Sequence, residues 1–241
     1  MPTPDTEKTK QLMDLFAVER SQRDEAWKDS FYEAVVDAAL VAATPQISPG
    51  PDTFLYFHLA IPAADQNFQP VCISEILETC LENGCGIVVE RNGATEWAFY
   101  YGHLWSLKQS GMFETKQHAT TGNDTVIADY SHAKVLKETT TQPRSVFTSQ
   151  PSNAFFPPYA RRAIKKFMTE RLRIIQPEMF LMNDPRNEPA QSLVFSIFKE
   201  NFKDEKEYTF AVSRLRWFLP DNYGLISVEN TQEWKSTFQP M

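Results

Sequence analysis

The segment 176–230 constrains the fold more than any other part of the chain, because strand, turn and helix signals follow one another there without a gap. Two apolar runs, rich in β-branched and aromatic residues, flank a turn segment at 184–189 that holds aspartate and proline. An amphipathic helix and a further apolar run come next. We therefore predict strands at 178–182, 193–198 and 225–228 and a helix at 205–218.

The helix at 205–218 has sequence signals at both ends. Asp204 is placed to accept a hydrogen bond from a first-turn amide, and Glu207 stands at capping-box spacing from it. Pro220 ends the helix because its ring cannot continue the hydrogen-bond ladder. An apolar stripe at three- and four-residue steps is expected to face the core: Tyr208, Ala211, Leu215 and Phe218.

The composition argues against some classes of protein. Of the 241 residues, 42% are hydrophobic, which is enough for a buried core. A formal net charge of -7 disfavours general attraction to nucleic acid or to an anionic membrane surface. No apolar run is long enough to cross a bilayer, the N-terminus lacks a signal-peptide pattern, and three cysteines do not make a disulfide framework. We therefore expect a cytoplasmic protein without membrane contact.

The rest of the chain alternates between helix and strand patterns. Residues 1–10 are polar and expected to be frayed, and Pro49, Gly50 and Pro51 predict a loop over 46–52. The pair Asn92-Gly93 between two apolar runs predicts a β-hairpin. The predicted helices are 11–18, 24–41, 75–82 with Ser74 as its cap, 103–109 and 159–173, and the predicted strands are 54–61, 86–90 and 95–101.

A threonine- and serine-rich segment at 114–153 separates the two halves of the chain. We expect it to be mainly a connector with one short strand at 126–128, and we place a domain boundary near residue 145. The expected fold class is α+β, with modules at 1–145 and 146–241, each an antiparallel or mixed sheet covered by helices. A helix followed by strands recurs in both halves, but no repeat of fixed period indicates a duplication.

Two features resemble a known bacterial family. One is the helix pattern FYEAVVDAALV at 31–41 with a strand after it, and the other is a C-terminal half that opens with PPYARR at 157–162. This layout resembles the enhanced serine sensitivity, or SseB-like, protein family. The segment 72–111 departs from the family pattern, with a longer hairpin and two helices. The resemblance implies a small cytoplasmic α/β protein that acts through protein contacts and has no established catalytic activity.

An aromatic cluster around the predicted hairpin is the first candidate interaction site. It comprises Trp97, Phe99, Tyr100, Tyr101 and Trp105. Exposed tyrosine and tryptophan side chains carry much of the binding energy of protein interfaces. The alternative is that flanking helices cover both faces of the hairpin, which would make these side chains core residues.

The basic segment 161–173 is the second candidate, because its charge opposes that of the acidic chain. Arg161, Arg162, Lys165 and Lys166 are positioned to dock an acidic partner or, as a weaker alternative, the backbone of RNA. The plainer interpretation is a solvated helix face, with Ile164, Phe167, Met168 and Leu172 turned to the core.

Cysteine and histidine residues offer a third candidate, an enzyme site between the modules. Cys85 and His103 flank the hairpin and could form a thiol–imidazole pair, although no local signature supports one. The plainer interpretation makes Cys72, Cys80 and Cys85 buried thiols and His103 a helix cap. His58 lies in an apolar strand and is expected to be a hydrogen-bonded core residue, while His118 and His132 are expected to be solvated.

No recognised catalytic motif occurs in the chain. Phosphate-binding glycine loops, nucleophile elbows, HExxH helices and paired metal-binding cysteines are all absent from the sequence. We therefore expect no cofactor and no metal. The leading hypothesis is a non-catalytic cytoplasmic protein of SseB-like type that binds another protein; a thiol or histidine enzyme and an RNA binder are the alternatives.

Overall fold

The computed structural model describes residues 3–63, 67–114, 146–184 and 188–241. The chain divides into two compact units, Met1–Phe113 and Glu114–Met241. The boundary predicted near residue 145 falls at the edge of the segment 115–145, which is outside the described residues, so its position stays a prediction. The predicted strand at 126–128, His118 and His132 fall in the same segment.

Unit 1 contains a five-stranded mixed sheet in the order β3-β1-β2-β4-β5. Only β2 and β4 run parallel; the other neighbours are antiparallel. The strands are β1 (Leu40–Pro49), β2 (Leu55–Ala60), β3 (Pro70–Val71), β4 (Gly86–Arg91) and β5 (Ala94–Phe99). The helices are α1 (Thr6–Ala17), the 3₁₀ turn η1 (Arg20–Gln22), α2 (Glu25–Val35), α3 (Ile73–Asn83) and α4 (Tyr101–Ser110).

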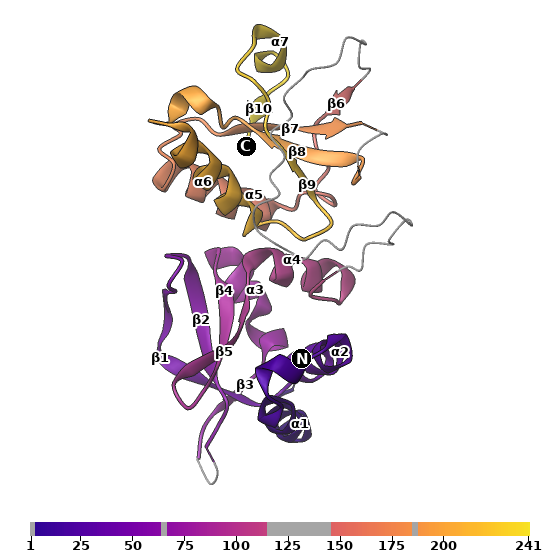
Figure 1. The fold of residues 1–241 in the computed structure, drawn as a ribbon, viewed down its shortest axis with the longest axis vertical. Helices are drawn as coiled ribbons and strands as arrows, with labels where there is room; N and C mark the ends of the chain where they lie inside the picture. The colour runs from indigo at the N-terminus through magenta and orange to yellow at the C-terminus, as the bar shows by residue number, and fades with distance from the viewer. Residues whose placement is uncertain (1–2, 64–66, 115–145, 185–187) are drawn as a thin grey trace. The chain divides into compact units, whose positions relative to one another are not determined.

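The helices of unit 1 lie against one face of this sheet (Figure 1). Leu59, Ile87 and Val89 point to that face and have no exposed surface. Phe31 of α2 stacks on Phe99 of β5, with ring centroids 5.9 Å apart. Side chains alternate between faces along each strand, so the residues between these point to the face without helices.

Unit 2 also contains a mixed sheet, in which β6 and β10 pair with successive parts of one edge of β7, followed by β8 and β9. Strands β7 and β8 are antiparallel, and β8 and β9 are parallel. The strands are β6 (Phe147–Ser149), β7 (Glu178–Asn183), β8 (Gln191–Phe195), β9 (Gly224–Ile226) and β10 (Gln239–Pro240). The helices are α5 (Pro158–Glu170), the 3₁₀ turn η2 (Lys199–Asn201), α6 (Glu205–Arg216) and α7 (Gln232–Lys235).

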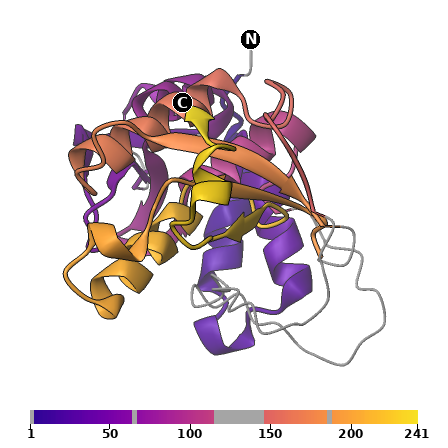
Figure 2. The ribbon, with the colours of Figure 1, turned by 90° about the horizontal axis from the view of Figure 1, so that it is seen from above.

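Both faces of the unit 2 sheet carry helices (Figure 1). Helices α5 and α6 share one face, where the rings of Phe167 and Phe218 lie 5.1 Å apart. The C-terminal segment with α7 lies across the other face, over β7 and β8 (Figure 2). There Phe180 contacts the rings of Trp234 and Phe238, at centroid distances of 5.7 and 4.9 Å.

The two units repeat one arrangement of elements. In unit 1, α2, β1, β2, α3 and β4 form a helix, an antiparallel strand pair, a second helix and a strand parallel to the second strand. In unit 2, α5, β7, β8, α6 and β9 form the same series with the same strand directions. The α+β class is thus confirmed, and the recurrence seen in the sequence corresponds to a shared topology.

The beginning of unit 1 differs from the sequence prediction. Asp5 caps α1 by accepting a hydrogen bond from the Glu7 amide at 2.8 Å, so the expectation that residues 1–10 are frayed is wrong from Asp5 onward. Helix α2 ends at Val35 and β1 is Leu40–Pro49, so the predicted helix to residue 41 is wrong, and so is the predicted loop over 46–49. The rest of that loop, 50–52, lies in the turn between β1 and β2 as predicted. The residues around Leu40 are buried on all sides, and periodicity alone does not separate a strand from a helix there.

Most other elements agree with the prediction to within a few residues. Asn92 and Gly93 form the turn of the β4–β5 hairpin, with φ values of 53° and 76°. Asp204 caps α6 through the Glu207 amide at 2.8 Å, as predicted. Ser74 is not the cap of α3; that position belongs to Cys72. The short elements β3, β6, α7 and β10 were not predicted, because two to four residues carry no periodicity to recognise.

Candidate functional site

The aromatic cluster of unit 1 is part of the core. Phe99, Tyr101 and Trp105 are fully buried, so an exposed aromatic face is wrong for these three residues. Trp97 is half-buried, and its ring lies 4.9 Å from Phe31. The cluster therefore fits the alternative interpretation, in which helices cover the hairpin. The buried side chains do not support its candidate role in binding.

The basic helix α5 turns its apolar side to the core as predicted. Arg162, Lys165 and Lys166 are exposed. Part of the charge serves the fold of unit 2 itself: Lys165 Nζ donates a hydrogen bond to the carbonyl oxygen of Met241 at 2.5 Å. The guanidinium of Arg161 lies over the Phe156 ring, 5.4 Å from its centroid. The solvated-face interpretation accounts for these contacts, and docking of an acidic partner or RNA stays a prediction.

Cys85 and His103 each have a hydrogen bond to the backbone of a neighbouring residue. Cys85 is fully buried and its Sγ donates to the carbonyl oxygen of Cys80 at 3.6 Å. The hydrogen bond to Cys85, together with burial, raises the pKa of Cys80, which keeps that thiol protonated. His103 Nδ1 accepts a hydrogen bond from the Tyr100 amide at 3.2 Å and so caps α4. Both residues have the structural roles given by the plainer interpretation.

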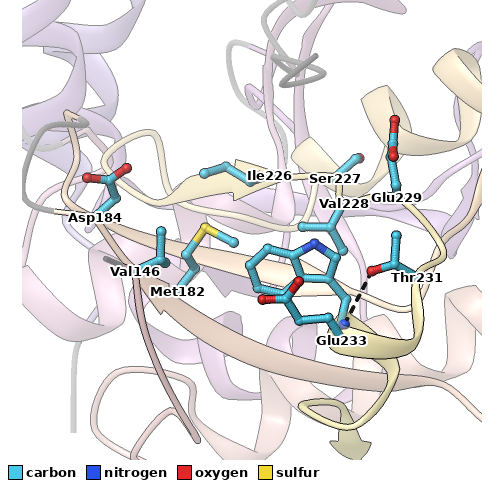
Figure 3. Close-up of a pocket in the computed structure, with 10 residues that line it drawn as sticks. Val146, Met182, Asp184, Ile226, Ser227, Val228, Glu229, Thr231 and Glu233 are labelled. Atoms are coloured by element: carbon cyan, nitrogen blue, oxygen red, sulfur yellow. Dashed lines mark hydrogen bonds between the residues drawn. The ribbon is translucent and has the colours of Figure 1, made fainter. Parts of the chain in front are cut away.

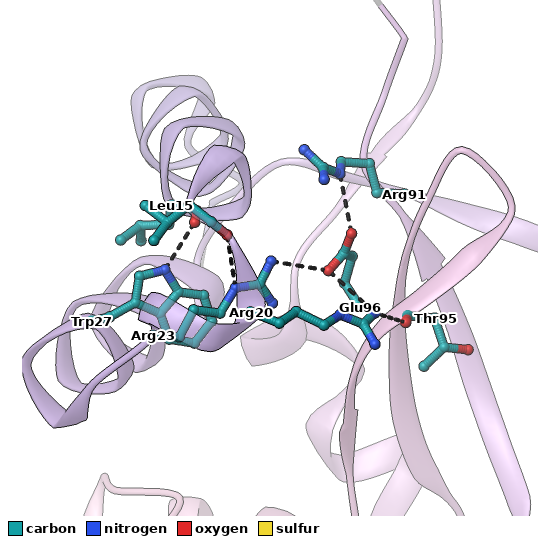
Figure 4. Close-up of polar contacts among 8 residues, drawn as sticks. Leu15, Arg20, Arg23, Trp27, Arg91, Thr95 and Glu96 are labelled. Atoms are coloured by element: carbon teal, nitrogen blue, oxygen red, sulfur yellow. Dashed lines mark hydrogen bonds and ion pairs between the residues drawn. The ribbon is translucent and has the colours of Figure 1, made fainter.

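A cluster of arginines around Glu96 joins the helices of unit 1 to its hairpin (Figure 4). Arg23 Nη2 and Arg91 Nε each lie 3.2 Å from a Glu96 carboxylate oxygen, and Arg20 Nη2 lies at 3.6 Å. The side chains of Glu96 and Arg23 are only 9% exposed. Arg23 also lies over the Trp27 ring at 4.7 Å. The pair of Glu96 and Arg23 is buried while Arg20 is exposed, and we assign the cluster to stability.

A pocket in unit 2 remains as a candidate binding site. It is a cavity of about 110 Å³ beside α7, on the sheet face that carries Phe180 and Phe238 (Figure 3). Its lining combines apolar and acidic residues: Val146, Met182, Asp184, Ile226, Ser227, Val228, Glu229, Thr231, Glu233 and Trp234. Strands β7 and β9 supply the floor, and the residues from Val228 to Trp234 supply the wall.

The pocket is formed by segments that are far apart in the sequence. Met182 and Ile226 belong to the buried cluster of this sheet face, and Trp234 packs against that cluster from α7. Thr231 begins α7 by accepting a hydrogen bond from the Trp234 amide at 3.4 Å, which sets the position of the indole (Figure 3). Asp184 is only 4% exposed although it lines the cavity.

The sequence analysis did not identify this site, because it ended its last element at residue 228. The available signal was Trp234 within the acidic stretch that begins at Glu229. An isolated tryptophan beside carboxylates is a weak indication, since one tryptophan in an acidic segment packs equally well as core.

Comparison with known proteins gives no relative. No protein-family model, curated protein or solved structure matches this chain. The resemblance to the SseB-like family therefore stays a prediction. Within the described parts of the chain, no helix combines the length and apolar character needed to cross a membrane.

Proposed function

We propose that unit 2 binds another protein by taking one of its lysine or arginine side chains into the pocket beside α7. The observation that carries this proposal is the combination of an apolar floor with the exposed carboxylates of Glu229 and Glu233. The described residues that line the cavity include no lysine, arginine or histidine. The site is therefore complementary to a cation.

The size of the cavity supports a side chain as the ligand. A cavity of roughly 150 Å³ in a protein core holds benzene, so about 110 Å³ accommodates the end of one side chain. Lysine and arginine bury an apolar stem while keeping a charged head close to polar groups. The Trp234 indole adds a cation–π contact, which contributes about 0.5–2 kcal/mol depending on desolvation.

This proposal keeps the protein-binding part of the leading hypothesis from the sequence, with its SseB-like type and cytoplasmic location, and moves it to a different site. The aromatic hairpin no longer supports it, since Phe99, Tyr101 and Trp105 are buried. RNA binding through α5 is less favoured, because the chain as a whole carries a formal charge of -7.

The test is calorimetric titration with short synthetic peptides whose central residue is lysine, arginine, norleucine or glutamate. We expect the cationic peptides to bind and the other two to bind at least about tenfold more weakly, because a hydrogen bond to a charged group contributes about 1.5–3 kcal/mol. The double variant Glu229→Gln/Glu233→Gln should abolish the preference for a cation.

The matched control is Glu170→Gln/Glu200→Gln, which removes the same charge from exposed positions of unit 2 that do not line the cavity. Equal loss of binding in both double variants would show that net charge attracts the peptide, and the pocket proposal would then be wrong. Equal affinity for the lysine and norleucine peptides would contradict it as well.

A further inference from the structure

Three polar side chains form a hydrogen-bonded line on the helix-free face of the unit 1 sheet. Ser48 Oγ lies 2.8 Å from His58 Nε2. His58 Nδ1 lies 2.8 Å from Glu90 Oε1. The side chains of His58 and Glu90 are 16% and 23% exposed, so the line is shielded from bulk water but not sealed from it.

The strand register places these residues together. Ser48 of β1 pairs with Tyr56 of β2, and His58 lies two residues further along β2, on the same face. His58 pairs with Val88 of β4, and Glu90 lies two residues further along β4. The line therefore crosses three adjacent strands diagonally, with one step of two residues at each strand.

The proton positions along the line follow from its chemistry. An ionised carboxylate only accepts hydrogen bonds, so His58 must donate to Glu90 through Nδ1–H. A neutral imidazole then has its lone pair on Nε2, and the Ser48 hydroxyl donates to it. A hydroxyl bonded to a base, with that base oriented by a third group, is the arrangement that activates a nucleophile.

A backbone donor lies beside the serine. The Gly50 amide donates to the Phe54 carbonyl at 2.8 Å. Hydrogen-bonded and non-hydrogen-bonded pairs alternate along an antiparallel ladder, so the backbone of Ser48 bonds to β2 and the Ile47 N–H points away from β2. Among the described residues, β3 pairs with β1 only at Leu40 and Val41, so the edge of β1 beside Ile47 carries no strand. We take the Ile47 amide as the candidate donor to an oxyanion formed at Ser48.

From this geometry we infer that Ser48 is a nucleophile toward esters, with His58 as its general base and Glu90 as the residue that orients His58. This activity goes beyond the binding role proposed for unit 2. Ser48 is half-buried on a face without helices, so the substrate class is an ester that reaches the sheet from solvent, such as an acyl group carried on a larger molecule.

In the acylation step, Ser48 Oγ forms a bond to the ester carbonyl carbon while its proton moves to His58 Nε2. The bond to the leaving alkoxide breaks, and the alkoxide takes the proton from Nε2. Water then attacks the acyl–serine carbonyl and gives a proton to Nε2. The bond between Oγ and the carbonyl carbon breaks, Oγ regains that proton, and a carboxylic acid leaves. Removing one oxyanion donor from an established site costs about 10²–10³-fold in rate, so we expect slow turnover with the Ile47 amide as the candidate donor.

The test is reaction of the full chain with a fluorophosphonate probe, which phosphonylates an activated serine and releases fluoride, with the labelled residue located by peptide mass spectrometry. We expect labelling at Ser48, none in Ser48→Ala, and at least about tenfold slower labelling in Glu90→Gln, which keeps a hydrogen-bonding side chain but removes the charge. Ser110→Ala is the control, since Ser110 is exposed and donates to the Ser106 carbonyl.

Hydrolysis of p-nitrophenyl acetate by the same variants gives a second readout, and circular dichroism with urea unfolding shows whether each variant is folded. Labelling of Ser48 no faster than of Ser110 in the unmodified chain would overturn the inference. So would an unchanged labelling rate in folded Glu90→Gln, because a merely structural hydrogen bond predicts no effect of that charge on serine reactivity.

Discussion

Replacing Glu96 with alanine tests the assignment of the arginine cluster to stability. The substitution removes the carboxylate shared by three arginines but leaves Arg23, which is only 9% exposed, with a buried charge. Breaking a buried ion pair by removing one partner costs about 3–5 kcal/mol. Arg20 is 69% exposed, and surface pairs of that kind contribute about 0–1 kcal/mol.

Arg23 keeps other contacts after the change. Its Nε donates to the Val18 carbonyl at 3.1 Å, and its guanidinium remains over the Trp27 ring. We therefore expect the lower end of the range, about 3 kcal/mol, as a loss of unfolding free energy for unit 1. The two units need not unfold together, so the measurement is urea-dependent hydrogen exchange of the α2 and β5 amides.

Glu33→Ala is the control, because it removes an exposed carboxylate whose pair with Lys8 spans 3.2 Å at the surface of the same unit. It should cost less than about 1 kcal/mol. If Glu96→Ala destabilises unit 1 no more than Glu33→Ala does, the cluster is not a stabilising element, and the reasoning from burial is wrong.

Three further substitutions test individual features of the fold. Gly86→Ala should lower the urea midpoint of unit 1 by an amount equivalent to about 1–3 kcal/mol or more, because its Cβ would clash with the Phe99 carbonyl oxygen. Asp204→Ala should cost unit 2 about 1 kcal/mol, with Asp204→Asn nearly neutral, since the α6 cap needs only an acceptor. Burial raises the pKa of the Cys72 thiol, so the contribution of this thiol to stability is complete below about pH 8.5 and is lost as the pH rises above that value. Between about pH 7 and 9.5, the urea midpoint of the unmodified protein should therefore fall more than that of Cys72→Ala.

Local signals in the sequence were sufficient to predict the elements that they mark. Helix α6 begins at the capping aspartate, Asp204, and its predicted stripe residue Leu215 is buried. The hairpin turns at Asn92-Gly93, where positive φ values are needed and these two residues adopt them readily. In each case the determining interaction lies within a few residues, so a short window of sequence contains it.

At the start of β1, a short window of sequence is not sufficient to predict the secondary structure. Residues from Ala38 to Val41 are apolar in a way that suits the end of a buried helix or the start of a buried strand. What decides between them is the pairing of Leu40 with Val71 and of Val41 with Ala60, partners that lie far along the chain. Only the tertiary structure supplies those partners.

The sequence by itself determined the α+β class, the capped helices and the hairpin turn, because these depend on near neighbours and on the proportion of apolar residues. The tertiary structure alone decided the candidate sites. The alignment of Ser48, His58 and Glu90 depends on the register of three strands, and the cavity beside Trp234 depends on the C-terminal segment crossing a sheet formed earlier in the chain. Register and crossing are set by contacts between distant residues, which composition, spacing and periodicity do not encode.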